Sequence, residues 1–139
     1  MGSQSIVCGY LETEPAFDYQ NETVLRMFPF DPKYPFPNVF SNIRPGYQSS
    51  MISFASSFKS LLEDWDEWEN KFELLLAQLH ARAAKVRLED EVEGAAKTIV
   101  YVCVSVEGSK LPPAARKWRK WYYARDGTVT GEHDVAVPP

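Results

Sequence analysis

The sequence is poor in the residues on which most metal and catalytic sites depend. Its 139 residues include two cysteines and two histidines, with no Cys-x-x-Cys pair, so a zinc site would need scattered ligands. A phosphate-binding glycine loop, a Gly-x-Ser-x-Gly elbow and a metalloprotease helix are also absent. Glu132, His133 and Asp134 are suitable residue types, but neighbours in an irregular tail cannot converge on one reacting atom. We therefore predict that the protein is not an enzyme and binds no metal or cofactor.

Long hydrophobic runs are absent as well. No stretch approaches the roughly 18 apolar residues that cross a bilayer, and the N-terminus lacks the charged and apolar blocks of a signal peptide. We expect a cytoplasmic protein without membrane contacts. With 45% hydrophobic and 24% charged residues the composition is that of a globular protein, and the length predicts one domain over residues 1–139. Residues 1–3 are a candidate cloning remnant and are set aside.

Both cysteines lie in apolar, strand-like stretches. Cys8 belongs to SIVCGYLE (5–12) and Cys103 to KTIVYVCVSV (97–106), where a buried thiol behaves as a small hydrophobic group. We expect both thiols to be buried and reduced, because two cysteines without an export signal do not make a disulfide framework. Pairing between neighbouring strands stays open.

Alternating apolar residues predict a sheet. The predicted strands are 5–12, 51–56, 84–89, 97–106 and 117–125. The last of these leads into an Asp126-Gly127 hairpin turn, although a helix over 114–124 is an open alternative. Residues 131–139 are expected to form a loose tail.

A strong helical period runs from residue 58 to residue 79. Large apolar side chains recur there at spacings of three and four, and each contributes about 1.5–3 kcal/mol when fully buried. They are Phe58, Leu61, Leu62, Trp65, Trp68, Phe72, Leu75, Leu76 and Leu79. A shorter helix is predicted from the cap Asn21 to Phe28. The expected fold is α+β, with an antiparallel sheet of about four to six strands packed against one long amphipathic helix and one short N-terminal helix.

Residues 29–50 are predicted to be a long loop. They contain five prolines, which neither a helix nor an inner strand tolerates. Aromatic residues in this loop, including Tyr34 and Phe36, favour packing against the rest of the molecule. They either seal the core from outside or bind a partner.

Acidic residues gather on the predicted long helix and after the strand that follows it. The ten acids between residues 63 and 93 are Glu63, Asp64, Asp66, Glu67, Glu69, Glu73, Glu89, Asp90, Glu91 and Glu93. Most charge runs are solvated surfaces, and the alternative is a docking surface for a basic partner, whose approach the negative potential would accelerate. Glu69 projects from the apolar stripe itself, and we expect it to pair with an Arg or Lys from the sheet.

Residues 110–125 have the opposite charge. Six basic residues and no acid occur there, interleaved with aromatic side chains. Residues 116–125 therefore suggest a nucleic-acid-binding or adaptor module, in which bases stack on the aromatic rings. The competing interpretation is a strand whose aromatics pack inward and whose cations pair with the acidic residues. The formal net charge of −4 would repel a polyanion, so we expect nucleic acid not to be the partner.

Three stretches together resemble a known class of proteins. SIVCGYLE, ISFASSFKSLLEDWDEWENKFELLL and AKVRLEDE are similar to small bacterial immunity proteins, which are encoded beside polymorphic toxins of contact-dependent or type VI secretion systems. The likeness covers about half of the chain and offers no catalytic residue to transfer. It implies a protein that binds one cognate toxin and blocks its active site, and many such toxins have basic clefts. The residues expected to face the toxin are Glu63, Asp64, Asp66, Glu67, Asp90 and Glu91, with Tyr34 and Phe36 as aromatic anchors.

Overall fold

The computed structural model of the chain describes residues 4–29, 32, 40–41, 43–59, 61–90, 95–104 and 112–135. The strands are β1 (Gln4–Thr13), β2 (Arg44–Pro45), β3 (Ser50–Lys59), β4 (Ala81–Asp90), β5 (Ala95–Cys103), β6 (Trp118–Tyr123) and β7 (Val129–Asp134). The α-helices are α1 (Asp18–Met27) and α2 (Trp65–Leu76), and the 3-10 helices are η1 (Pro15–Phe17), η2 (Leu61–Asp64) and η4 (Pro113–Ala115).

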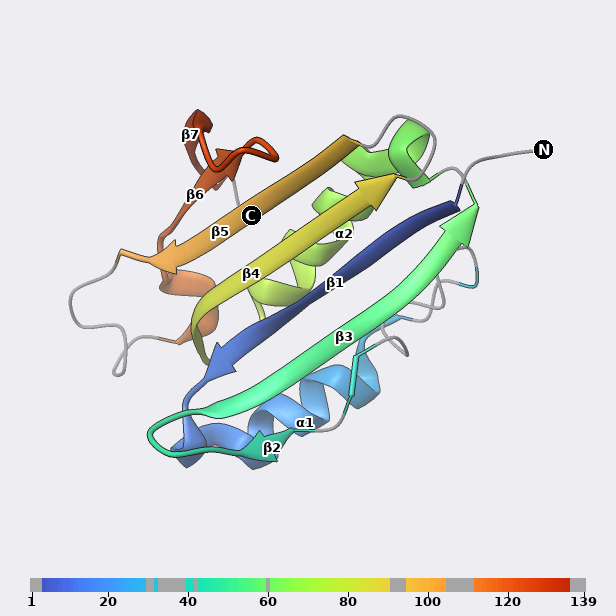
Figure 1. The fold of residues 1–139 in the computed structure, drawn as a ribbon. Coiled ribbons are helices and arrows are strands. Elements are labelled where there is room, and N and C mark those ends of the chain that lie inside the picture. The colour runs from blue at the N-terminus through green and yellow to red at the C-terminus, as the bar shows by residue number, and fades with distance from the viewer. Residues whose placement is uncertain are drawn as a thin grey trace.

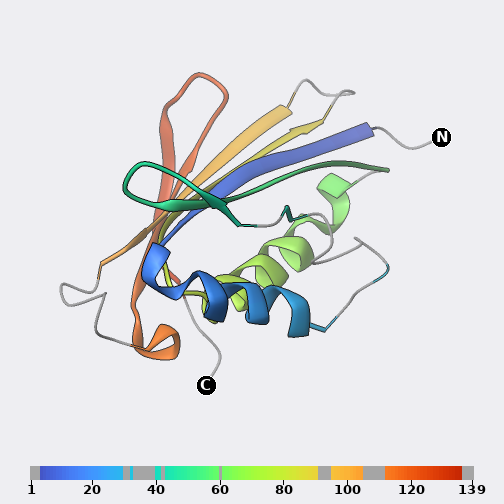
Figure 2. The same ribbon diagram turned by 90° about the horizontal axis from the view of Figure 1, so that it is seen from below.

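One antiparallel sheet contains all the described strands, in the order β2-β3-β1-β4-β5-β6-β7 (Figure 1). Both α-helices lie on the same side of it, so the molecule has a sheet layer and a helix layer (Figure 2). The α+β class and the antiparallel sheet are thereby confirmed. Among the described helices, none is long and apolar enough to span a membrane.

The predicted long helix is wrong in its extent. The α-helix α2 has 12 residues, and Phe58 belongs to β3, where it pairs with Ser5 of β1. Phe58 fits the two-residue strand period with Phe54 as well as the helical period with Leu61. The ten-residue pairing of β3 with β1 decides between them, and η2 then turns the chain into α2. The layer therefore contains two short α-helices.

The end of the chain is more regular than predicted. Residues 118–123 form a strand, which excludes the helix over 114–124 apart from the single turn η4. The expected loose tail is wrong for residues 131–134, which belong to β7 and pair with β6. A tight turn explains this pairing, because Gly127 takes a φ of 87° and Thr128 N donates a 2.9 Å hydrogen bond to Asp126 Oδ1. Residues 136–139 lie outside the described part.

An aromatic core lies between α2 and the sheet. The Trp68 and Phe72 rings of α2 stack at 5.4 Å, and Phe72 contacts Tyr101 of β5 at the same centroid distance. Phe40, from the predicted loop, packs on Phe54 of β3 at 4.8 Å, so this part of the loop seals the core. The tryptophans of the helical stripe are core residues, as the period indicated.

The two cysteines do not pair. Cys8 and Cys103 are both free thiols and both partly exposed, which corrects the expectation of full burial. Cys8 shares a sheet face with Arg87, whereas Cys103 lies on the side of the helices and packs against the core.

Candidate functional site

The predicted acidic site is only partly assembled. Asp64, Asp66 and Glu67 are exposed around the start of α2. The side chain of Glu63 and the residues Glu91, Tyr34 and Phe36 lie outside the described part of the structure. Three acidic side chains therefore remain as an acidic end of the molecule, which we define as Asp64, Asp66 and Glu67.

Asp90 is a structural residue, which corrects its prediction as a contact residue. It is only 4% exposed, and its Oδ2 accepts a 3.0 Å hydrogen bond from Ser5 Oγ. The same hydroxyl oxygen accepts a 3.1 Å hydrogen bond from the backbone nitrogen of Leu61. Asp90 thus ties the end of β4 to β1 and η2, because a buried carboxylate needs such partners. The acidic run around it gave no sign of this burial.

Glu69 has the partner that the sequence predicted, in a polar network between α2 and the sheet. Lys120 Nζ donates hydrogen bonds to Glu69 Oε2 at 2.9 Å and to Glu73 Oε2 at 2.6 Å. Tyr122 OH donates to Glu69 Oε2 at 2.6 Å, and Tyr101 OH donates to Glu73 Oε2 at 2.8 Å. The network joins α2 to β5 and β6 through charge-assisted hydrogen bonds.

The pKa values of Tyr101, Lys120 and Tyr122 in this network are all raised, so these groups keep their protons at neutral pH. Burial, aided by the Glu73 carboxylate, raises the pKa of Tyr101 well above its ordinary value. Burial and the hydrogen bond to Glu69 raise the pKa of Tyr122 to about 12. Burial alone would lower the pKa of Lys120, but its hydrogen bonds to Glu73, Tyr122 and Glu69 outweigh burial and raise it. Because these three groups are held away from neutrality, they suit a structural tie better than general acid–base catalysis.

Replacing Tyr122 by Phe is expected to flatten the loss of stability at alkaline pH. The pKa of Tyr122 rises from 10.0 to about 12 in the folded protein, so its stabilising effect is complete below pH 10 and is lost as the pH rises towards 12. Urea unfolding of Tyr122→Phe should show a free energy that falls less steeply over this interval. Tyr123→Phe, on the other sheet face, is the control and should keep the wild-type slope. A wild-type slope in Tyr122→Phe would contradict the prediction.

A second buried ion pair lies beyond the C-terminus of α2, beside the start of β4. Arg116 donates to both carboxylate oxygens of Glu14, at 2.8 and 3.2 Å, and to the backbone oxygen of Ala81 at 3.0 Å. The His80 ring is stacked on Phe17 at 3.9 Å, and burial together with the Arg116 charge lowers its pKa. Arg116 therefore has a structural role, and its buried side chain does not belong to any binding surface formed by residues 116–125.

Strand β6 divides the basic, aromatic segment between the two faces of the sheet. Trp118, Lys120 and Tyr122 point towards α2. Arg119, Trp121 and Tyr123 lie on the opposite face, since they pair with Val102, Val100 and Thr98. Lys120 pairs with acids of α2 and Arg119 with Glu132 of β7, so cation pairing with acidic residues accounts for part of this segment.

The face of the sheet opposite the helices is the strongest candidate for a binding surface. We call it the helix-free face, because no described helix covers it (Figures 1 and 2). Its central row crosses six strands and consists of Ser53, Tyr10, Lys85, Val100, Trp121 and Glu132. The next row consists of Cys8, Arg87, Thr98 and Tyr123.

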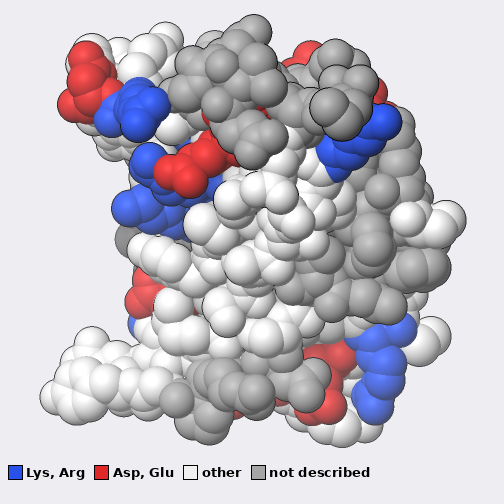
Figure 3. Space-filling model, turned by 45° about the vertical axis from the view of Figure 1, so that its right-hand side comes forward, with Lys and Arg blue, Asp and Glu red and all other residues white. Residues whose placement is uncertain are grey.

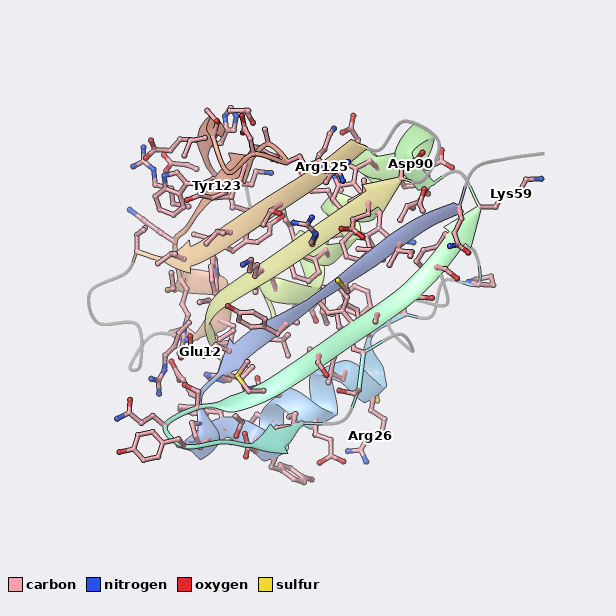
Figure 4. The ribbon with its side chains drawn as sticks, in the orientation of Figure 1. Glu12, Arg26, Lys59, Asp90, Tyr123 and Arg125 are labelled. Atoms are coloured by element: carbon pink, nitrogen blue, oxygen red, sulfur yellow. The ribbon has the colours of Figure 1, made fainter. Side chains whose placement is uncertain are left out.

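The helix-free face includes exposed apolar side chains. Of the nine large hydrophobic residues exposed in the described part of the chain, four belong to it, with 37–51% of their surface accessible. These are Ile6, Tyr10, Val102 and Val129. Figure 3, which turns the right-hand side of Figure 1 forward, shows uncharged side chains in the middle of the view and charged ones towards its outline. In Figure 4, Glu12, Lys59 and Tyr123 lie near the ends of their strands around this face.

The cations of the helix-free face differ in their pairing. Arg87 lies 2.9 Å from Glu89, and Arg119 lies 2.7 Å from Glu132. Lys85 is exposed and makes no hydrogen bond or ion pair with any described residue. The face therefore has little net charge, with one unpaired cation in its central row.

Sequence reasoning did not single out this face. The two-residue period of residues 84–89 already placed Lys85 and Arg87 on the same side of their strand, and this period is the sequence signal that could have indicated the face. It does not show that Tyr10 and Trp121 lie in the same row as Lys85, because that depends on how distant strands pair.

Comparisons with known proteins found no relative. No protein-family model matches the chain, and no curated protein or solved structure matches it significantly. Within the described residues, no group of three or more His, Cys, Asp or Glu side chains is placed to hold a metal ion. The function is therefore inferred from the surfaces of the chain itself.

Proposed function

We propose that this protein is an immunity protein that binds a cognate bacterial toxin and covers its active site. The observation that carries the proposal is the helix-free face. An antiparallel sheet with one solvated face normally presents polar side chains there. This face also exposes Ile6, Tyr10, Val102 and Val129, beside the charged side chains of Lys85 and Arg87, and exposed apolar side chains with polar neighbours mark protein interaction sites.

The acidic end supplies a second element of the proposal. Asp64, Asp66 and Glu67 are exposed, and their negative potential would steer a toxin that has a basic cleft. Long-range charge mainly accelerates encounter and selects the partner, whereas desolvated aromatic anchors provide most of the affinity. We therefore assign affinity to the helix-free face and steering to the acidic end.

A protein partner fits the helix-free face better than a nucleic acid does. Nucleic-acid binding depends on neutralising several phosphates with lysine and arginine side chains. Here Arg87 and Arg119 are already paired with acids, which leaves Lys85 in the central row and Lys59 at the end of β3 as the cations of this face without a partner among the described residues. Trp121 and Tyr123 offer stacking surfaces, but the charge balance favours a protein.

Co-expression with a toxin domain encoded in the neighbouring reading frame tests the proposal. We expect the toxin domain alone to arrest growth and this protein to restore it. The purified pair should form a complex that abolishes the activity of the toxin. Growth arrest that persists despite folded, well-expressed protein would contradict the proposal.

Two tyrosines provide a matched pair of variants for locating the contact. Tyr10→Ala changes the helix-free face, and Tyr19→Ala changes the outer surface of α1, where Tyr19 is 76% exposed. We expect Tyr10→Ala to weaken toxin binding at least about tenfold, as for an anchor residue, and Tyr19→Ala to leave it unchanged. Equal affinities of both variants, measured by calorimetry, would remove the helix-free face from the proposal.

A further inference from the structure

We infer that the protein partner presents an aspartate or glutamate side chain to Lys85, in the central row of the helix-free face. The inference rests on the proposed function and adds the chemistry of the contact.

The register places an aromatic and an apolar side chain directly opposite Lys85, while Arg87 lies two residues along β4 on the same face. Tyr10 of β1 and Val100 of β5 lie directly opposite it on the two adjoining strands, and Trp121 lies opposite Val100. Side chains at directly opposed positions have Cβ atoms about 4.5–5.5 Å apart. A partner that packs on these side chains therefore also covers the stem of Lys85 and removes its ammonium group from water.

A covered ammonium group needs an anionic partner. Removing a charge from water without a compensating charge is strongly unfavourable. The acid nearest to Lys85 in the register is Glu12, diagonal to it on β1, and Glu12 Oε1 accepts a 2.7 Å hydrogen bond from Ser49 Oγ. The other acids of the face are engaged as well, since Glu89 pairs with Arg87 and Glu132 pairs with Arg119. Within the described residues, nothing supplies Lys85 with a carboxylate, so the partner must supply it.

The charge pattern also limits the kind of anion. A nucleic acid would bring a row of phosphates, each of which needs a cation. The central row offers one cation between Tyr10 and Val100. One carboxylate in an otherwise apolar protein surface is complementary to this arrangement, and its pairing with Lys85 would fix the orientation of the partner.

Charge reversal at Lys85 tests the inference. The probe is the toxin domain of the neighbouring reading frame, titrated against wild type, Lys85→Glu, Lys85→Gln and the control Lys97→Glu. Lys97 is an exposed lysine of β5 that points to the other sheet face. We expect Lys85→Glu to weaken binding at least about 100-fold and Lys85→Gln at least about tenfold. Lys97→Glu should stay within about threefold of wild type. The Lys85→Gln variant keeps the test valid if the reversed charge impairs folding.

A compensating change in the toxin identifies the acid. Each exposed Asp or Glu of the toxin domain is changed to Lys and tested against Lys85→Glu. We expect one such change to restore binding to Lys85→Glu and to weaken binding to wild type. If wild type binds the toxin and both Lys85 variants bind equally well, the inference is wrong while the proposed function stands. If wild type does not bind the toxin, the proposed function itself fails.

A labelled single-stranded oligonucleotide provides the remaining arm of the test. At low salt we expect no binding by wild type. Binding that is lost in Lys85→Glu and that weakens steeply with salt would identify the face as a nucleic-acid surface and overturn the inference.

Discussion

Replacing Arg116 by Met is expected to lower the free energy of unfolding by about 3–5 kcal/mol. The Arg116 side chain is 1% exposed and that of Glu14 is 7% exposed, so the variant leaves a carboxylate buried without its counter-charge. It also removes the hydrogen bond to Ala81 at the start of β4. Urea unfolding, compared with wild type at one pH, measures the loss. Domains are typically stable by only about 5–15 kcal/mol, so this is a large fraction.

The chain contains a matched exposed pair for comparison. Arg119 and Glu132 lie 2.7 Å apart with side chains that are 44% and 45% exposed. Arg119→Met should therefore cost less than about 1 kcal/mol. The double variant Glu14→Gln/Arg116→Met should be more stable than Arg116→Met alone, because it removes the unpaired charge. Equal losses for Arg116→Met and Arg119→Met would show that the buried pair has no special role.

Replacing Gly9 by Ala is expected to destabilise the protein by about 3 kcal/mol, at the upper end of the usual cost of overpacking. A Cβ atom at Gly9 would overlap the backbone oxygen of Lys85 on β4 and lie 2.9 Å from Phe54 Cζ on β3. The two strands that flank β1 thus leave no room for a methyl group. Thermal unfolding, with the shift in midpoint converted to free energy, measures the effect.

The sign of the Gly9→Ala effect separates packing from chain entropy. If only the freedom of the unfolded chain mattered, Ala would stabilise the strand relative to Gly. Cys8→Ala, at the adjacent position on the opposite face, is the control and should change stability little. A stabilised Gly9→Ala variant would show that the β1 neighbours relax at little cost.

Local periods in the sequence predicted the parts of the fold that depend on neighbouring residues. The helical period made Trp65 and Trp68 core residues, and both are at most 4% exposed. The same period placed Glu69 in the apolar stripe and required a cation for it, and that cation is Lys120. These predictions held because the faces of a helix follow from spacing alone.

The predictions that failed depended on pairing between different parts of the chain. Phe58 satisfies a strand period and a helical period equally, and its pairing with Ser5 selects the strand. Asp90 was predicted to belong to a solvated acidic run. In the fold it is buried and accepts a hydrogen bond from Ser5, which in turn accepts one from Leu61. The C-terminal residues 131–134 gained order by pairing with β6. For Phe58 and Asp90 a partner far away in the sequence decided the outcome, whereas residues 131–134 pair with the preceding strand across the turn at Gly127.

The amino-acid sequence by itself determined the α+β class, the alternation within each strand and the apolar stripe of α2, because these follow from periods of two and of three to four residues. Only the tertiary structure decided which sheet face the helices cover and which residues share a row on the other. Tyr10, Lys85 and Trp121 meet because β1 pairs with β4, β4 with β5 and β5 with β6. Their register is set by long-range pairing and core packing, which no local pattern encodes.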